Sequence, residues 1–452
     1  MKKLLLLKWL YPGMCVKRWL FLALAGLFLA AFGVDLIMKG NLFGGLAGPV
    51  HNLETGLPGG ELHWLLGIVL LVLGLAVMSL GILRAFHSVA VALAPEKEGR
   101  MAEIIYARHN LRRGPRIVVI GGGTGLSVLL RGLKEYTSNL TAIVSVADDG
   151  GSSGRLRGDL GMLPPGDIRN CLVALADKEP LMEELLQYRF KTGELAGHSL
   201  GNLLLAALTG MTGSFDQAVR TLSKVLAIRG QVLPVTLSDV TLCAELEDGA
   251  VVQGQSHISR SPGRIKKVFL QPSRCLPLAE ALFAIRSADA VVLGPGSLYT
   301  SIIPNLLVKG IPEALAKTQA PKIYICNVMT QPGETDGYTA SGHLEALFAH
   351  GGTAIDYAVV NTGPVPPRLR VRYLQMGANP VAADMVEIER MGVQAVGEDL
   401  VHKTLVVRHH QDKLAQAVLR LTFADRGRHN RVRYLNERRR DGKVEELTRA
   451  EV

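Results

Sequence analysis

One stretch decides the fold, residues 116–170: RIVVIGGGTGLSVLLRGLKEYTSNLTAIVSVADDGGSSGRLRGDLGMLPPGDIRN. In it a β-branched run, Ile117–Ile120, meets three glycines, Gly121–Gly123, and a helical pattern then leads to a second apolar run, Ile143–Val146. This is a strand–loop–helix–strand unit with a glycine turn where a nucleotide phosphate would lie. It predicts an α/β fold with a Rossmann-like, mostly parallel sheet.

The glycine turn suits an anion for a steric reason. Backbone approaches a pyrophosphate closely only where no Cβ intervenes, and a helix that starts near Thr124 directs free N–H groups at the anion. The spacing departs from the dinucleotide fingerprint, because Leu126 stands where the third glycine is needed. A tight turn without a ligand is the alternative. The phosphate-binding candidates in this turn are Gly121, Gly122, Gly123, Thr124 and Gly125.

A second loop, rich in glycine and serine, follows the second strand. Its hydroxyls, bare N–H groups and arginines are anion donors. We expect Asp148 or Asp149, just past a strand end, to accept a hydrogen bond from a ribose hydroxyl or to hold a divalent cation; the alternative is that both only turn the loop. Asp167 is predicted to cap the helix Ile168–Ala176. The binding candidates are Asp148, Asp149, Gly151, Ser152, Ser153, Arg157, Arg169 and Asn170.

Two further segments contribute candidates. In the apolar helix Gly197–Leu208, His198 and Asn202 share one face, and His198 either contacts a phosphate, acts as an acid or base, or is an ordinary capping or core histidine. A third glycine turn, GPGS, follows the buried strand Ala290–Leu293; plain helix capping is its alternative. Its candidates are Gly294, Gly296, Ser297, Thr300 and Ser301. Because ligands of open α/β sheets bind at the carboxyl ends of strands, we expect the three turns to converge.

Between these segments the pattern changes to short strands with turn signals. This section reads as a β-rich insert that forms a flap or an oligomer contact. Its expected strands are Val232–Thr236, Cys243–Leu246, Val251–Gln255 and Lys267–Leu270.

The N-terminal region differs in kind. Two apolar stretches, Trp19–Met38 and Trp64–Leu83, are each long enough to cross a bilayer. Buried core helices, or a signal peptide for the first stretch, are the alternatives. Recurrent glycines favour close packing as an antiparallel transmembrane hairpin. The excess of lysine and arginine outside the connecting loop places both termini and the main domain in the cytoplasm.

The expected organisation therefore has four parts. Residues 1–83 are the N-terminal segment and hairpin, residues 84–114 a linker, residues 115–425 the nucleotide-binding domain, and residues 426–452 a basic tail. The net charge is +10, yet no nucleic-acid partner is expected, because no aromatic-interleaved or zinc-type motif accompanies the basic residues; anionic lipid fits better. The five scattered cysteines indicate reduced thiols.

Several segments resemble one family. GGGTG-L, VADDGGSSGRLR and PPGDIRN, with the later segments Gly197–Leu208, Val291–Leu315 and Ile325–Leu344, are similar to the gluconeogenesis-factor (YvcK-like) proteins of bacteria. These are related to CofD-like 2-phospho-L-lactate transferases. The resemblance spans about residues 116–421. It implies a Rossmann-like fold, binding of UDP-sugars such as UDP-N-acetylglucosamine, and a role in cell shape and cell-wall synthesis on gluconeogenic carbon. Its usual member is soluble, so the hairpin is a departure.

Three functions compete. The first is a membrane-tethered UDP-sugar-binding regulator that requires no cofactor. The second is a transferase that moves a phospholactyl-type group to an acceptor hydroxyl, with Mg²⁺ on Asp148 or Asp149. The third, a nicotinamide-dependent oxidoreductase, rests only on the glycine turn. No catalytic residue is assigned. The expected partners of the first are the nucleotide ligand, the cytoplasmic membrane, cell-wall synthesis proteins and a second copy of the chain.

Overall fold

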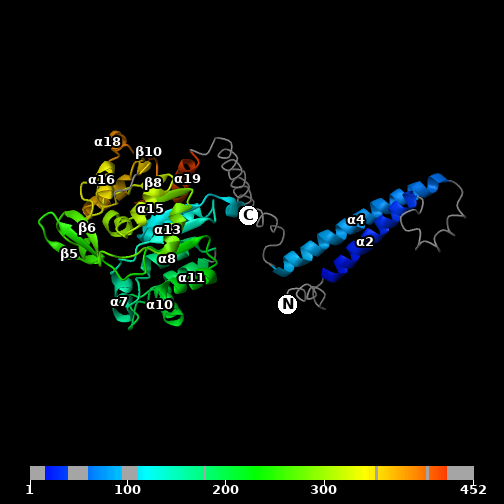
Figure 1. Ribbon diagram of the computed structural model, residues 1–452, viewed down its shortest axis with the longest axis horizontal. Helices are drawn as coiled ribbons and strands as arrows, with labels where there is room; N and C mark the ends of the chain where they lie inside the picture. The colour runs from blue at the N-terminus through cyan, green and yellow to red at the C-terminus, as the bar shows by residue number, and fades with distance from the viewer. Residues whose placement is uncertain are drawn as a thin grey trace. The chain divides into compact units, whose positions relative to one another are not determined.

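The computed structural model describes residues 16–38, 60–93, 109–177, 180–351, 355–403 and 407–424. The chain divides into two units, Met1–Arg108 and His109–Val452 (Figure 1). The predicted basic tail 426–452, residues 94–108 of the predicted linker and residues 39–59 between the two predicted spans lie outside the described residues.

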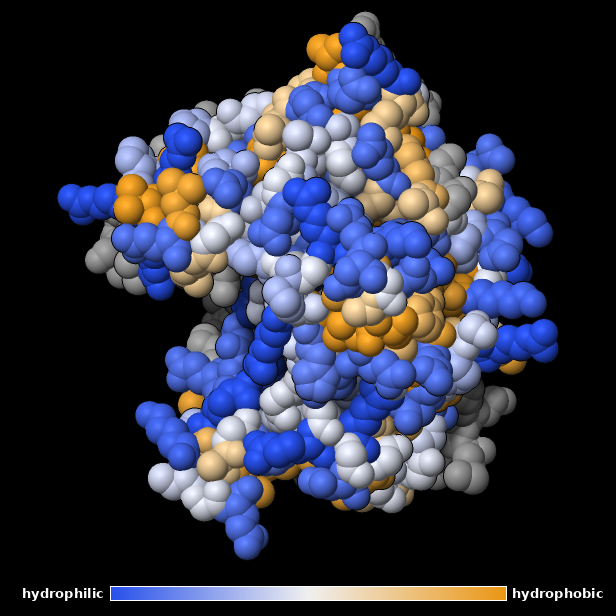
Figure 2. All heavy atoms as spheres, turned by 90° about the vertical axis from the view of Figure 1, so that its left-hand side faces the viewer, coloured by the Kyte–Doolittle hydropathy of each residue, from blue (hydrophilic) through white to orange (hydrophobic). Residues whose placement is uncertain are grey.

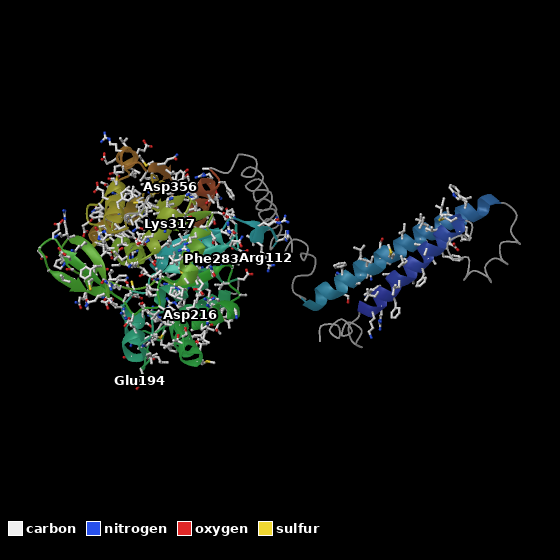
Figure 3. All side chains as sticks on the ribbon, in the orientation of Figure 1. Arg112, Glu194, Asp216, Phe283, Lys317 and Asp356 are labelled. Atoms are coloured by element: carbon white, nitrogen blue, oxygen red, sulfur yellow. The ribbon has the colours of Figure 1, made fainter. Side chains whose placement is uncertain are left out.

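The N-terminal unit contains two long apolar helices, α2 (Val16–Ile37) and α4 (Gly60–Leu93). Their backbones touch at glycines: a Cβ on Gly26 would overlap the backbone of Met78, and one on Gly74 would overlap that of Ala30. The predicted helix pair is therefore confirmed, and α4 runs ten residues past the predicted end of its span. Lys17–Ile37 and Trp64–Ser88 are candidate membrane spans by length and composition. Side chains project from the outer faces of both helices (Figure 3). Phe28 and Phe86 are each 75% exposed.

The second unit is built on a sheet of seven parallel strands in the order β10-β9-β8-β7-β1-β2-β3. The strands are β1 (Ile117–Gly121), β2 (Leu140–Val144), β3 (Gln231–Pro234), β7 (Ala290–Leu293), β8 (Lys322–Ile325), β9 (Tyr357–Asn361) and β10 (Gln394–Glu398). The chain leaves β1 toward β2 and β3, then returns to pair β7 on the other side of β1. This confirms the Rossmann-like sheet and places its switch point between β1 and β7.

Helices pack against this sheet (Figure 1). In α6 (Gly123–Leu133), Leu126, Leu129, Leu130 and Leu133 are fully buried. Their i, i+3, i+4, i+7 spacing makes a single apolar face, which packs the helix against α8 and α19. The remaining helical segments of this unit are α7 (Gly151–Leu160), α8 (Gly166–Leu175), α9 (Pro180–Gln187), α10 (Leu200–Thr212), α11 (Phe215–Val225), α13 (Ala279–Arg286), the π-helical turn η3 (Leu298–Ile302), α14 (Ile303–Leu306), α15 (Ile311–Lys317), α16 (Ala340–Gly351), α17 (Pro367–Gln375), α18 (Met385–Arg390) and α19 (Gln411–Thr422).

The predicted β-rich insert is present between β3 and β7. It is an antiparallel sheet of β4 (Thr241–Leu246), β5 (Val251–Gln253) and β6 (Ile265–Gln271), with the short helix α12 (Gln255–Ile258). One assignment was wrong: Val232–Thr236 lies largely in β3, which pairs parallel to β2 in the main sheet. Its continuous apolar run is typical of a parallel strand buried on both faces, whereas an insert strand alternates.

Two smaller features complete the domain. Strands β11 (Val401–Lys403) and β12 (Val407–His409) pair antiparallel just before α19. The four described cysteines, Cys171, Cys243, Cys275 and Cys326, are free and buried, as expected of reduced thiols, and Cys15 lies outside the described residues.

Candidate functional site

The glycine turns after β1 and β7 meet in direct backbone contact. A Cβ on Gly125 would lie 2.7 Å from the carbonyl oxygen of Pro295, and one on Gly296 would lie 3.1 Å from that of Gly122. Gly123 and Gly294 have φ angles of 70° and 83°, in the left-handed region that glycine adopts without strain. Only residues without side chains allow this approach, so the two turns form one continuous surface at the switch point.

The second candidate loop is mostly a helix. The chain turns into α7 at Gly151, which places Ser152 and Ser153 in its first turn, both buried. Ser153 Oγ accepts a hydrogen bond from the Gly166 N–H at 3.1 Å, which joins the start of α7 to the start of α8. Glycine and serine content suggested a loop, but the helix is set by packing of Leu156 on the domain core.

The two adjacent acids diverge. Asp148 accepts a hydrogen bond from the Gly150 N–H at 3.0 Å, and its other oxygen lies beside Gly166. Asp149 instead accepts from the Ser256 N–H of α12 at 2.8 Å, so it holds the insert against the loop. Of the two acids predicted to hold a cation, Asp149 therefore contacts the insert, and Asp148 lies beside the start of α8.

Asp167 differs from its prediction as a helix cap. It does not cap α8, whose N-cap is Pro165 with no side-chain hydrogen bond. Its carboxylate reaches the first glycine turn instead: one oxygen lies 2.6 Å from where a Cβ on Gly122 would be, and the group accepts a hydrogen bond from the Gly123 backbone. Burial, and next the charge of Asp148, raise the pKa of Asp167 to about 6.

Asp148 and Asp167 thus form a mutually repelling pair beside the glycine turn. A divalent cation between them would neutralise both charges. No cluster of three or more histidine, cysteine or acidic side chains suited to a metal occurs within the described ranges. A cation at Asp148 and Asp167 would take its other ligands from phosphate and water, which is the usual way Mg²⁺ binds.

A buried polar network lies behind this pair. Asn202 donates to Ser152 Oγ at 3.0 Å, and His198 Nδ1 lies 3.0 Å from the same oxygen. Arg169 donates to Asn202 Oδ1 at 3.1 Å and to the hydroxyl of Ser199. His198 and Asn202 meet at Ser152, but not through the predicted helix face: α10 begins at Leu200, so the predicted helix Gly197–Leu208 starts too early and His198 precedes it. Burial lowers the pKa of His198, which favours its neutral form.

Arg169 has one donor to spare. Its side chain is buried, and its Nε has no hydrogen-bond partner among the described residues. A second guanidinium nitrogen donates to Asn170 Oδ1 at 2.8 Å. A buried cationic N–H without an acceptor is costly, so an anionic ligand at this position would satisfy it.

Arg157 lies elsewhere. Its guanidinium forms an ion pair of 2.5 Å with Asp239 and donates to the Val240 carbonyl at 2.9 Å, at the entrance to the insert. In this structure the position of Arg157 near the end of α7 directs its guanidinium to the insert, and its predicted phosphate contact stays a prediction.

The third turn is engaged by Glu334, a residue that the sequence did not single out. Buried Glu334 accepts hydrogen bonds from Thr300 Oγ1 at 3.0 Å and from the backbone N–H groups of Tyr299 and Thr300. Ser297 donates to Gln331 at 2.6 Å, and Gln331 donates to Glu334 at 2.6 Å.

The carboxylate of Glu334 therefore takes the donors of η3 that an external anion would otherwise use. Ser297 and Thr300 are committed to this internal cluster, whereas Ser301 faces the first turn, with Oγ 3.6 Å from the Cβ position of Gly123. Burial raises the pKa of Glu334, so the cluster holds a carboxyl group at some free-energy cost. The sequence feature that could have identified Glu334 is an acidic residue in the proline–glycine turn Gln331–Glu334.

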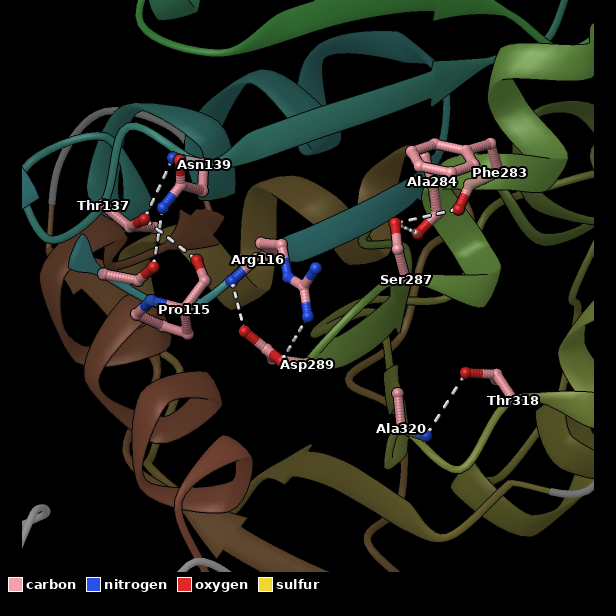
Figure 4. Close-up of polar contacts among 11 residues, drawn as sticks. Pro115, Arg116, Thr137, Asn139, Phe283, Ala284, Ser287, Asp289, Thr318 and Ala320 are labelled. Carbon is pink, nitrogen blue, oxygen red and sulfur yellow. Dashed lines mark hydrogen bonds and ion pairs between the residues drawn. The ribbon is translucent and has the colours of Figure 1, made fainter. Parts of the chain in front are cut away.

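Figure 2 shows the face that carries the insert, with a notch whose visible walls are mostly hydrophilic. A separate cavity of about 310 Å³ lies at the opposite, amino ends of β1, β2 and β3, next to Phe283. There Arg116 pairs with Asp289, and Asn139 and Thr137 bond to backbone carbonyls (Figure 4). Since ligands of such sheets bind at carboxyl ends, this cavity is not the favoured site.

The chain is similar to several known proteins. The family model described as 2-phospho-L-lactate transferase CofD matches residues 117–401. A relative from Nostoc sp. is 47% identical over 425 residues, covering 91% of this chain and 92% of the relative, so that match includes α4. The gluconeogenesis factor of Bacillus subtilis is 53% identical over 310 residues, covering 68% of this chain and 98% of its own. A crystal structure of a UPF0052 family member from Bacillus halodurans matches with a TM-score of 0.66 and 51% identity, covering 68% of this chain and 99% of that chain.

Proposed function

This chain belongs to the gluconeogenesis factor family and carries a CofD domain, and we propose that this domain binds a nucleotide sugar such as UDP-N-acetylglucosamine. The observation that carries the proposal is the backbone contact between the glycine turns of β1 and β7 at the switch point. Such a surface accepts a pyrophosphate closely, and the spare N–H of Arg169 adds a cationic donor.

In this proposal the protein is a regulator of cell shape and cell-wall synthesis on gluconeogenic carbon, tethered to the cytoplasmic membrane by α2 and α4 with its main domain in the cytoplasm. Two observations support the tether. The glycine contacts make a compact pair of apolar helices. The B. subtilis relative is matched over 98% of its own length by 68% of this chain, so a shorter member of the family has no counterpart to about a third of it. Tethering would raise the effective concentration of the domain near membrane-bound synthetic enzymes.

Calorimetry on the fragment His109–Val452 tests the ligand. UDP-N-acetylglucosamine should bind, GDP, NAD and a deazaflavin should bind more weakly, and each should be titrated with and without Mg²⁺. Gly125→Val should weaken binding at least tenfold, because its side chain would force apart the turns that Gly125 and Pro295 join. Gly158→Ala is the matched control, since nothing lies within 4 Å of its Cβ position.

Because Gly125→Val also strains the turn, Arg169→Gln provides a second measurement. It removes the spare cationic donor and should weaken the sugar nucleotide while a folded thermal transition persists. If both variants bind as tightly as the parent fragment, the ligand lies elsewhere.

A second function is favoured by one observation, the pairing of Asp148 with Asp167. In a transferase this pair would hold Mg²⁺ and the cation would neutralise the phosphate charge as a phospholactyl-type group moves to an acceptor hydroxyl. We expect no turnover of the bound UDP-sugar. Metal-dependent release of nucleotide or sugar that is abolished by Asp167→Asn would put the transferase first.

A further inference from the structure

Helix α17 lies unusually open on the second unit. No residue from Pro367 to Gln375 is buried. Val371 is 56% exposed, Leu374 45% and the following Met376 63%, although apolar side chains of this size are usually covered. The helix therefore presents apolar groups that nothing in the described parts of the chain covers.

The exposed residues form an ordered face. At 3.6 residues per turn, Val371 and Leu374 lie about 60° apart on one side of α17. Arg370 flanks this stripe next to Leu374, and Arg368 with Arg372 flanks it beyond Val371. The half-buried Leu369 and Tyr373 take the remaining side, toward the domain.

The charge on this helix has one sign. All three arginines are exposed, and residues 366–376, PPRLRVRYLQM, contain no acid. An apolar stripe between arginines is the pattern of a helix that lies in the plane of an anionic bilayer surface. A soluble phosphate ligand would use the arginines but has no use for exposed valine, leucine and methionine.

We propose that α17 docks on an anionic lipid surface, with Val371 and Leu374 in the headgroup region and with Arg368 and Arg370 on lipid phosphates. This inference rests on the membrane location proposed above, and it adds a contact made by the second unit itself.

The contact would lie next to the candidate ligand site. The segment after α17 pairs with the loop after β8: the Thr330 N–H donates to the Asn379 carbonyl at 2.7 Å, and the Asn379 N–H donates to Thr330 Oγ1 at 2.9 Å. The same loop carries Gln331 and Glu334, which bind the turn after β7. Docking of α17 would therefore hold the mouth of the site close to the bilayer.

Vesicle sedimentation of His109–Val452 tests this contact without the apolar helices. The B. halodurans relative, which corresponds to this part alone, crystallises as a folded protein. The fragment should pellet with vesicles of phosphatidylcholine and phosphatidylglycerol but not with phosphatidylcholine alone, and the binding should weaken with salt. Arg368→Gln with Arg370→Gln should lower partitioning by at least tenfold, and Val371→Ser with Leu374→Ser should lower it several-fold.

The matched control is Val386→Ser with Arg390→Gln on α18, where Val386 is 65% exposed and Arg390 is paired with Glu387. It should leave partitioning unchanged. Equal partitioning of the α17 variants and the parent would assign the lipid contact to another basic region and overturn the proposal. Reduced calorimetric affinity for the UDP-sugar in the arginine variants, with vesicle binding intact, would overturn it too and place α17 in the ligand site; loss of vesicle binding with ligand affinity intact supports it.

Discussion

Folding makes the ionised form of the Asp167 carboxyl group less favourable. Its pKa rises from 3.8 to about 6 on folding, because burial and Asp148 oppose its charge. The folded state therefore keeps a proton that the unfolded chain has lost, and the free energy of unfolding falls as pH rises from about 4 through about 6. The total loss is at most about 3 kcal/mol.

Asp167→Asn should remove this cost. We expect a higher free energy of unfolding at pH 7.5, by up to about 3 kcal/mol, and a smaller gain at pH 5, together with weaker Mg²⁺-dependent nucleotide binding. Urea denaturation at the two pH values measures the first effect. An equal gain at both values would show that Asp167 is not the titrating group.

Glu334 is expected to stabilise the fold by joining three segments through hydrogen bonds. Glu334→Ala leaves the donors of Ser259, Thr300 and Gln331 without their acceptor, so it should cost about 3 kcal/mol of unfolding free energy, and Glu334→Gln should cost less. Denaturant unfolding provides the measurement. Exposed Glu345→Ala on α16 is the control and should lie within about 0.5 kcal/mol of the parent. A loss of unfolding free energy below 1 kcal/mol for Glu334→Ala would contradict this stabilising role.

Among helices and strands, the insert offers the clearest test. Arg157 holds its entrance through Asp239 and the Val240 carbonyl. Because Asp239 is largely exposed, Arg157→Ala should cost only about 1 kcal/mol globally, yet it should loosen the insert. Limited proteolysis should cut faster at the turn Glu247–Gly249, while ligand affinity changes less than threefold. A tenfold loss of affinity would return Arg157 to the binding site.

The periodicity of apolar residues predicted the helices and strands that bury one clear face. It failed for segments whose structure depends on contacts with distant parts of the chain. The sheet, the β-rich insert and the two apolar helices follow from runs of β-branched or apolar residues. Helix α7 was missed because GSSG reads as a loop, and β3 was placed in the insert because a short apolar run does not reveal its partner. The glycine turns could be predicted to meet; that Glu334 would fill one of them could not, since its partners lie on three separate segments.

For the chain as a whole, the first unit should be separable. Deleting residues 1–108 should move the protein to the soluble fraction after a high-salt wash and leave nucleotide-sugar affinity nearly unchanged. Fractionation and calorimetry measure the two effects. A tenfold loss of affinity, about 1.4 kcal/mol, would mean that the units are coupled. Full retention on washed membranes would mean that the helices are not the main anchor.

The position of β1 between β2 and β7 has a consequence for how the domain is made. The strand β1 pairs with β2, which follows it closely in sequence, but its other edge pairs with β7, 173 residues further along. Next to this pairing the Arg116 N–H donates a hydrogen bond to Asp289. Closing so long a loop is slow relative to local pairing. During synthesis the glycine turn of β1 therefore emerges long before its counterpart, and a nascent chain stopped before β7 has half a binding surface. If the domain binds as proposed, a nucleotide sugar would therefore bind only chains whose synthesis has passed β7 and whose central sheet is complete.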